Sequence, residues 1–164
     1  MFGSTNSQRK THEGIMANTY TQIYYHIVFS TKNRVRCIGK DHRDPLYGYI
    51  WGIHKNLKCH LYRIGGVEDH VHILTSIHPT LSLSKYIEEV KTGSTNWIRR
   101  ERVIPDWPGW QDGYGAFTAA NHDKDAIIEY IKGQEEHHRT VSFREEYEAM
   151  LKRAGVEYDP KYLE

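Results

Sequence analysis

The chain has 164 residues, the length of one ordinary domain, and is long enough to bury a core without disulfides or structural metals. Its 38% hydrophobic and 26% charged residues are typical of a soluble globular protein. The formal net charge of +1 excludes the overall basic character of many nucleic-acid-binding proteins, although a local patch could still bind phosphates. Cys37 and Cys59 form no metal or disulfide motif, and no stretch could cross a membrane or act as a signal peptide. We therefore expect a cytoplasmic protein with reduced thiols.

The N-terminal part of the chain predicts an extension, a strand and a basic loop. Residues 1–15 are polar and lack periodicity, so we expect a disordered extension ahead of a single domain at 16–164. From Thr19 to Thr31, aromatic and β-branched residues alternate with others, which predicts a strand. The loop that follows contains several basic side chains, which are most often simply solvated: Lys32, Arg34, Arg36 and Lys40.

The remaining elements predict the fold class. In chain order we first expect a helix at 43–58 with Pro45 in its first turn, and then a hairpin through Gly65-Gly66 into a strand from residue 70. A helix at 81–102 and a short strand at 113–119 follow. The last two elements are a helix from Asn121 or Asp123 to about His138 and a helix at 144–153. This order is that of the α+β ferredoxin-like, or split βαβ, fold: an antiparallel sheet with helices on one face, here followed by C-terminal helices. Its first and third strands are central.

The strand after the double glycine carries His70 and His72 at alternate positions. Alternate side chains share one face of a strand, so the two imidazoles point the same way, while Val71 and Ile73 form an aliphatic opposite face. Two ligands of one metal ion would be arranged in this manner. The chain contains 11 histidines, however, so a pair at this spacing also arises by chance, and the pair alone does not establish a metal site.

A polar stripe lies on the helix expected after the last strand. Tyr130, Gln134 and His137 fall on one helical face, and most stripes of this kind are simply solvated. If this face instead packs against the histidine strand, Gln134 could supply a third ligand beside His70 and His72. Neutral nitrogen and oxygen ligands of this kind favour Mg²⁺ or Mn²⁺ over a structural zinc ion. Tyr130 would then place a nucleophilic oxygen beside a polarised phosphate, and the role of His137 stays open.

Several stretches of the chain resemble the single-tyrosine HUH transposases of bacterial insertion sequences, which move as single-stranded DNA. They are Gly-Gly-Val-Glu-Asp-His-Val-His-Ile-Leu at 65–74 and Tyr-Ile-Lys-Gly-Gln-Glu-Glu-His-His at 130–138, together with residues 16–32 and 110–117. The motifs have the order and spacing of that family, and the chain also resembles the REP-associated tyrosine transposases. On this resemblance, residues 16–164 form a single HUH transposase domain.

The resemblance implies a DNA strand transferase that cleaves and rejoins single-stranded DNA at insertion-sequence ends through a 5′-phosphotyrosine intermediate. It implies that Tyr130 is the nucleophile and that Gln134 completes a metal site with His70 and His72. The implied cofactor is Mg²⁺ or Mn²⁺. The implied assembly is a homodimer in which the tyrosine helix of one subunit serves the histidine pair of the other. The implied partner is a DNA hairpin near each element end, for which the candidate contacts are Lys32, Arg34, Arg36 and Lys40.

Three other functions remain open on the sequence. A domesticated member of the same group, acting on dispersed palindromic repeats, would carry the same motifs. A non-catalytic nucleic-acid-binding module of ferredoxin-like fold would stack bases on sheet aromatics such as Tyr24 and form no covalent adduct. A small metal-dependent hydrolase in which Tyr130 merely packs would keep its turnover in a Tyr130→Phe variant.

Overall fold

The computed structural model describes residues 20–163, and the N-terminal extension expected at residues 1–15 lies outside this range. Four strands form one antiparallel sheet in the order β2-β3-β1-β4. They are β1 (Tyr24–Ser30), β2 (His60–Gly66), β3 (His70–Ser76) and β4 (Gly115–Ala119). The strand that carries the two histidines therefore lies in the middle of the sheet beside β1, as the ferredoxin-like order predicts.

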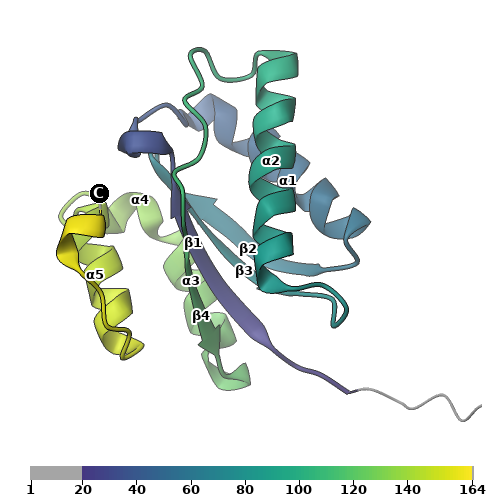
Figure 1. Cartoon of the computed structure of the whole chain (residues 1–164). Coiled ribbons are helices and arrows are strands. Elements are labelled where there is room, and N and C mark those ends of the chain that lie inside the picture. Colours follow the sequence, from purple (N-terminus) through teal and green to yellow (C-terminus); the bar gives the residue numbers. More distant parts are fainter. Residues whose placement is uncertain (1–19, 164) are drawn as a thin grey trace, which may run out of the picture.

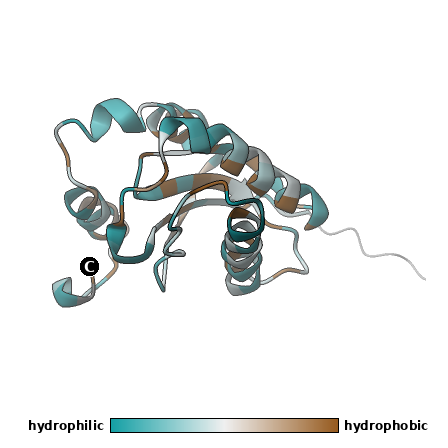
Figure 2. Cartoon of the chain, turned by 90° about the horizontal axis from the view of Figure 1, so that it is seen from above, coloured by the Kyte–Doolittle hydropathy of each residue, from teal (hydrophilic) through white to brown (hydrophobic). Residues whose placement is uncertain are grey.

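Five α-helices accompany the sheet: α1 (Lys40–Asn56), α2 (Leu83–Glu101), α3 (Lys124–Lys132), α4 (Gln134–His137) and α5 (Phe143–Arg153). Figure 1 shows α1 and α2 together on one face of the sheet and α3 on the other, and Figure 2 shows the sheet from above between these helices. The α+β prediction is confirmed, with the C-terminal helices covering the face that α1 and α2 leave open. No helix in the range 20–163 is long and apolar enough to span a bilayer.

Each face of the sheet has its own hydrophobic contacts. On one side, Ile27 and Phe29 of β1 and Val71 and Ile73 of β3 pack with apolar residues of α1 and α2. On the other side the apolar cluster is smaller, and its buried members are Tyr24, Leu74 and Ile131. The period of two in β3 thus places its aliphatic side chains in the main core and its histidines on the opposite face.

Two helix boundaries differ from the sequence-based expectation. Helix α1 begins at Lys40, so Pro45 lies in its second turn. Proline has no N–H, so the backbone carbonyl of Asp41 receives no helical hydrogen bond from it, and Asp41 is exposed. The single helix expected up to about His138 is divided into α3 and α4 at Gly133. Glycine weakens a helix interior, and the break here places Gln134 at the start of a separate helix.

Local contacts fix the turn that presents the histidines and the start of the last helix. The N–H of Val67 donates to the carbonyl oxygen of His70 (3.2 Å), which closes the turn between β2 and β3. A Cβ on Gly66 would collide with that same carbonyl oxygen, so the close turn requires glycine. At the far end of the chain, Ser142 and Glu145 form a capping box that begins α5.

Candidate metal centre and nucleophile site

The two histidines of β3 are completely buried, and each is held through its Nδ1 atom. Nδ1 of His70 lies 2.7 Å from the Asp69 carboxylate, and Nδ1 of His72 lies 3.0 Å from Nε2 of His26 on β1. A carboxylate can only accept a hydrogen bond, so it places the proton of neutral His70 on Nδ1 and leaves a lone pair on Nε2. Both Nε2 atoms point into the space between the sheet and the C-terminal helices.

Gln134 lies in this space, as the sequence predicts. Its side chain is 1% exposed, and its Oε1 atom lies 3.2 Å from Nε2 of His70. Its Nε2 donates to the Glu146 carboxylate at 2.9 Å, which fixes the orientation of the amide and identifies Oε1 as the atom that faces the histidine. The structure therefore brings together the three residues that the resemblance names as metal ligands.

Tyr130 lies at the edge of the same site. Its hydroxyl donates a hydrogen bond to Glu146, and its ring makes edge contacts with His72 and His26 at centroid distances of 5.9 and 6.0 Å. Burial and the Glu146 carboxylate raise the pKa of the phenol above its ordinary value. A cleft of about 670 Å³ between α3, α5 and the β4 edge gives access to the ring from outside.

Tyr130 meets the other site residues of its own chain. Within one chain, Tyr130 contacts the ring of its own His72 and shares Glu146 with its own Gln134. Because α3 packs along β2 and β3 of the same sheet, all four predicted site residues meet without a partner subunit.

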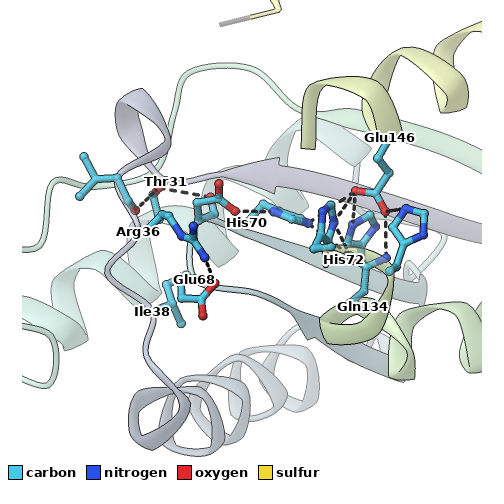
Figure 3. A network of polar contacts seen from close by, with 12 residues as sticks. Thr31, Arg36, Ile38, Glu68, His70, His72, Gln134 and Glu146 are labelled. Carbon is cyan, nitrogen blue, oxygen red and sulfur yellow. Dashed lines mark hydrogen bonds and ion pairs between the residues drawn. The ribbon is translucent and has the colours of Figure 1, made fainter. Parts of the chain in front are cut away.

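Sequence reasoning missed two residues at the centre of the site, Glu146 of α5 and His138 just after α4. Glu146 is 3% exposed, and its Oε2 atom lies 3.1 Å from Nε2 of His138 and 3.3 Å from Nε2 of His72. Figure 3 shows its carboxylate pointing from α5 toward His72 and Gln134. The sequence did contain a sign that Glu146 is buried, because it lies in the apolar stripe of α5, three residues after Phe143 and four before Met150.

The electrostatics of the site are set by this carboxylate. Burial alone would raise the pKa of Glu146, but the imidazoles of His138 and His72 and the hydroxyl of Tyr130 hold it well below its ordinary range. Burial also opposes charge on His138, yet Glu146 outweighs that effect and raises the pKa of the imidazole. His72 is more deeply buried, and burial lowers its pKa despite the carboxylate.

The donor set fits a divalent ion. Nε2 of His72 is buried and makes no hydrogen bond, and it points at the same location as Nε2 of His70. His70, His72, His138 and Glu146 each offer a ligand atom, and these atoms all lie within 4.8 Å of one another. Imidazole nitrogens and carboxylate or amide oxygens are ordinary ligands of divalent metals in proteins.

The four predicted basic residues lie apart from this centre. Lys32 and Arg34 belong to a short 3-10 helix after β1, Lys32–Arg34, whereas Arg36 pairs with Glu68 at 3.1 Å and Lys40 pairs with Glu135 at 3.0 Å. A groove of about 540 Å³ connects three of them to the metal centre, because its lining includes Arg34, Arg36, Lys40 and His138. Figure 3 shows the polar network that runs from Arg36 and Glu68 past His70 to Glu146.

Comparison with known proteins identifies the family of the chain. The family model described as "Transposase IS200 like" matches residues 19–134, which is most of the chain. No curated protein matches the chain.

Two solved structures share the fold. A Deinococcus radiodurans R1 protein named as a transposase is 22% identical with a TM-score of 0.56, covering 72% of this chain and 95% of its own. A REP-associated tyrosine transposase bound to a REP hairpin is 14% identical with a TM-score of 0.57, covering 77% of this chain and 76% of its own. The family match, together with this shared fold, shows that the chain belongs to the IS200-like transposases and is a DNA transposase.

Proposed function

We propose that the chain cleaves and rejoins single-stranded DNA through a covalent bond to Tyr130, with a divalent metal ion as cofactor. One observation carries the proposal: the Tyr130 hydroxyl is hydrogen-bonded to a carboxylate that also faces the buried pair His70 and His72. A nucleophile and a set of metal donors thus share one site at the end of an accessible cleft. We further propose that residues 16–164 act as one domain. Glu146 lies beyond residue 134, where the family match ends, yet it reaches the same site as His72.

In the proposed reaction the Tyr130 oxygen forms a bond to the phosphorus atom, and the bond to the 3′ oxygen breaks. The products are a 5′-phosphotyrosine and a free 3′-hydroxyl, so the phenolic proton is balanced by the proton gained at the 3′ oxygen. Attack of a 3′-hydroxyl on the phosphotyrosine reverses the step and needs no nucleotide cofactor, because the phosphodiester bond is conserved. Glu146 holds the Tyr130 oxygen beside the metal donors before the step.

The cofactor in this proposal is Mg²⁺ or Mn²⁺, held by His70, His72 and Gln134. Such an ion supplies a positive charge that polarises the scissile phosphate. The side chains of the protein provide the rest: Asp69 fixes the ring of His70, and His26 fixes the ring of His72.

The proposed nucleic-acid partner is a DNA hairpin. The REP-associated neighbour of similar fold is bound to a REP hairpin, and the chain offers Lys32, Arg34, Arg36 and Lys40 for phosphate contacts. A domesticated relative would use the same chemistry. The alternative of a module that stacks bases on Tyr24 is less favoured, because Tyr24 is 5% exposed under α3 and its hydroxyl donates to Asn121.

We also propose a homodimer, in a form adjusted to the structure. Transposition requires cuts at both ends of an element, and two subunits would hold two such sites. Because Tyr130 lies against the histidines of its own chain, we propose that each subunit cleaves with its own tyrosine and that pairing brings two cleavage sites together.

The test uses single-stranded hairpin oligonucleotides from the ends of its own element, labelled on either side of the presumed cut. The oligonucleotides are incubated with protein and Mg²⁺ or Mn²⁺ and separated on a denaturing gel. We expect a protein band that carries the 3′-side label and disappears with Tyr130→Phe or with a chelator. Shifted DNA without a covalent band under either metal would reject the proposed chemistry and support a binding module. Turnover that survives Tyr130→Phe would point to a hydrolase.

A further inference from the structure

The metal centre contains more donors than the resemblance provides. Besides His70, His72 and Gln134, the imidazole of His138 and the carboxylate of Glu146 enter the same buried space, with side-chain exposures of 9% and 2%. Both come from residues beyond 134, where the family match ends. Oε2 of Glu146 lies 3.1 Å from His138, 3.3 Å from His72 and 3.5 Å from His70, each measured to Nε2.

The hydrogen bonds of His138 leave its Nε2 atom without a proton when the ring is neutral. Its Nδ1 lies 2.7 Å from the backbone carbonyl oxygen of Val141, and a carbonyl only accepts, so the ring proton is on Nδ1. Its Nε2 lone pair then faces Oε1 of Gln134 and Oε2 of Glu146, both at 3.1 Å. Lone pairs at such a distance repel one another unless a cation lies between them, which can be a proton on Nε2 or a metal ion that takes its place.

The same conflict occurs at His70, whose Nδ1 proton is assigned to Asp69 and whose Nε2 faces the Gln134 oxygen at 3.2 Å. Nε2 of His72 has no hydrogen-bond partner at all. Adjacent ligands about 2.1 Å from a metal ion lie roughly 3.0 to 3.4 Å apart, for octahedral and tetrahedral sites respectively. The contacts of 3.1 to 3.3 Å between these donors have that spacing, and the ligand atoms of His70, His72, His138 and Glu146 all lie within 4.8 Å of one another. One ion can therefore lie among atoms that otherwise repel.

We propose that His138 and Glu146 are ligands of the metal ion, so that the site holds three imidazoles, one amide oxygen and one carboxylate. The proposal rests on the metal dependence argued under the proposed function and names the residues that determine which ion is bound. Three nitrogen donors favour a transition-metal ion over Mg²⁺, which prefers oxygen ligands and retains its waters. Of the two ions named under the proposed function, Mn²⁺ is therefore the better match to this donor set.

Glu146 has a second role in this arrangement, because its two oxygens face different groups. Oε1 accepts hydrogen bonds from the Tyr130 hydroxyl and from Nε2 of Gln134, while Oε2 faces the three imidazoles. A metal ion bound to Oε2 would therefore fix the position of the nucleophile through the same carboxylate. Glu146 is thus both a ligand and the positioning residue of Tyr130.

Isothermal titration of the full chain with Mn²⁺ and with Mg²⁺, in the absence of DNA, tests the proposal. We expect wild type to bind one Mn²⁺ at least about tenfold more tightly than Mg²⁺. Glu146→Gln and His138→Gln should each weaken Mn²⁺ binding by about tenfold or more, since even outer partners of ligands contribute that much. The exposed residues Glu136 and His122 supply the matched controls Glu136→Gln and His122→Gln, which should bind as wild type does.

The outcomes separate this inference from the proposed function. If wild type and both variants bind Mn²⁺ equally while His70→Ala does not, the added ligands are wrong and the metal-dependent function stands. Unchanged Mn²⁺ binding with faster cleavage in Glu146→Gln would likewise overturn the inference and make α5 a cover over the site. If wild type binds neither ion yet still cleaves DNA, the metal dependence itself fails.

A measurement on the wild-type chain removes the dependence on how well the variants fold. In ¹⁵N spectra of the histidine rings, Zn²⁺ serves as a diamagnetic probe of the same site. We expect the Nε2 signals of His70, His72 and His138 to shift together at one equivalent of Zn²⁺, while the His122 signals stay in place. A His138 signal that does not follow those of His70 and His72 would exclude it as a ligand.

Discussion

Gly65 of β2 lies directly against Ile131 of α3, so closely that a Cβ on the glycine would stand 2.7 Å from the carbonyl oxygen of Ile131 and 2.8 Å from its Cγ2. The close approach holds α3, which carries the proposed nucleophile Tyr130, against the sheet. Gly65→Ala should force α3 outward and lower the free energy of unfolding by about 1–3 kcal/mol, the usual cost of overpacking. Urea denaturation measures this, together with slower formation of the covalent adduct because Tyr130 moves with the helix.

Gly48 provides the control for this prediction. It lies on the exposed side of α1, and a Cβ there would meet no atom within 4 Å. Gly48→Ala should raise the free energy of unfolding by about 0.5–1 kcal/mol, because alanine loses less conformational freedom in a helix. Equal effects at the two glycines would show that the contact with Ile131 is unimportant.

The Asp69 carboxylate should increase the affinity for the metal ion without being a ligand. The carboxylate lies 2.7 Å from Nδ1 of His70 and orients the ring. Asp69→Asn should weaken this hydrogen bond and make Nε2 of His70 less basic. We expect metal affinity to fall by about 10- to 100-fold, measured by titration, with little change in thermal unfolding in the presence of chelator. Asp125→Asn, an exposed position on α3, is the control. An Asp69→Asn variant with wild-type affinity would remove Asp69 from the metal centre.

A mixing experiment decides whether each site belongs to one chain. Tyr130→Phe lacks the proposed nucleophile and His70→Ala lacks a proposed metal donor, so each variant alone should form no covalent adduct. If each chain uses its own tyrosine, as the contact of Tyr130 with His72 implies, a mixture of the two stays inactive. Restored cleavage in the mixture would require a tyrosine from one subunit at the histidines of the other. Light scattering on the same samples reports whether the chains are paired.

His26 should make the metal-free protein sensitive to acid. Burial, with a smaller effect of His72, lowers its pKa from 6.5 to about 3, so the folded chain keeps the ring neutral where the unfolded chain binds a proton. The contribution of His26 to the free energy of unfolding is fully present above pH 6.5 and is lost as the pH falls toward 3. The loss amounts to up to about 1.4 kcal/mol per pH unit. In urea unfolding with chelator, His26→Gln should lose less stability between about pH 6 and about pH 5. The same slope for wild type and variant would contradict this, and the exposed His122→Gln serves as control.

The four basic residues should contribute unequally to DNA binding. In the part of the chain that the structure describes, Lys32 and Arg34 form no ion pair, whereas Arg36 and Lys40 are paired with glutamates. Lys32→Ala or Arg34→Ala should weaken binding of a hairpin oligonucleotide and reduce its salt dependence by about one phosphate contact. Arg36→Ala and Lys40→Ala should have smaller effects, because those charges are already partly neutralised. Fluorescence anisotropy over a range of salt concentrations compares them, and four equal slopes would contradict the ranking.

The sequence predicted the site best where periodicity is strong. The alternation of His70, Val71 and His72 correctly placed the imidazoles opposite the aliphatic core. Tyr130 and Gln134 both reach the same site, as their spacing predicted, although Gly133 divides the expected helix between them. These are local relations that one element determines by itself. The strand order followed from the number and sequence of elements, so the central position of β3 was also predictable.

Glu146 could not be placed in the same way, because its role depends on how α5 packs against the sheet. A glutamate followed by charged and polar neighbours looks like a solvated helix position, and only its place among Phe143 and Met150 suggested otherwise. His138 was expected merely as the end of a helix. Its contact with Glu146 requires the break at Gly133 and the turn before Ser142, which are features of tertiary packing rather than of local pattern.

The separation of the two faces of β3 has a consequence for the evolution of such elements. Val71 and Ile73 help to hold the core, while the proposed chemistry uses the imidazoles across the strand. Under the proposed function, a copy in which His70 and His72 are replaced by other polar residues would lose strand cleavage while the aliphatic face of β3 stays in the core. If that copy still bound the hairpins of active elements, it would compete with their transposase, and the loss of activity in one gene would restrain the spread of the others.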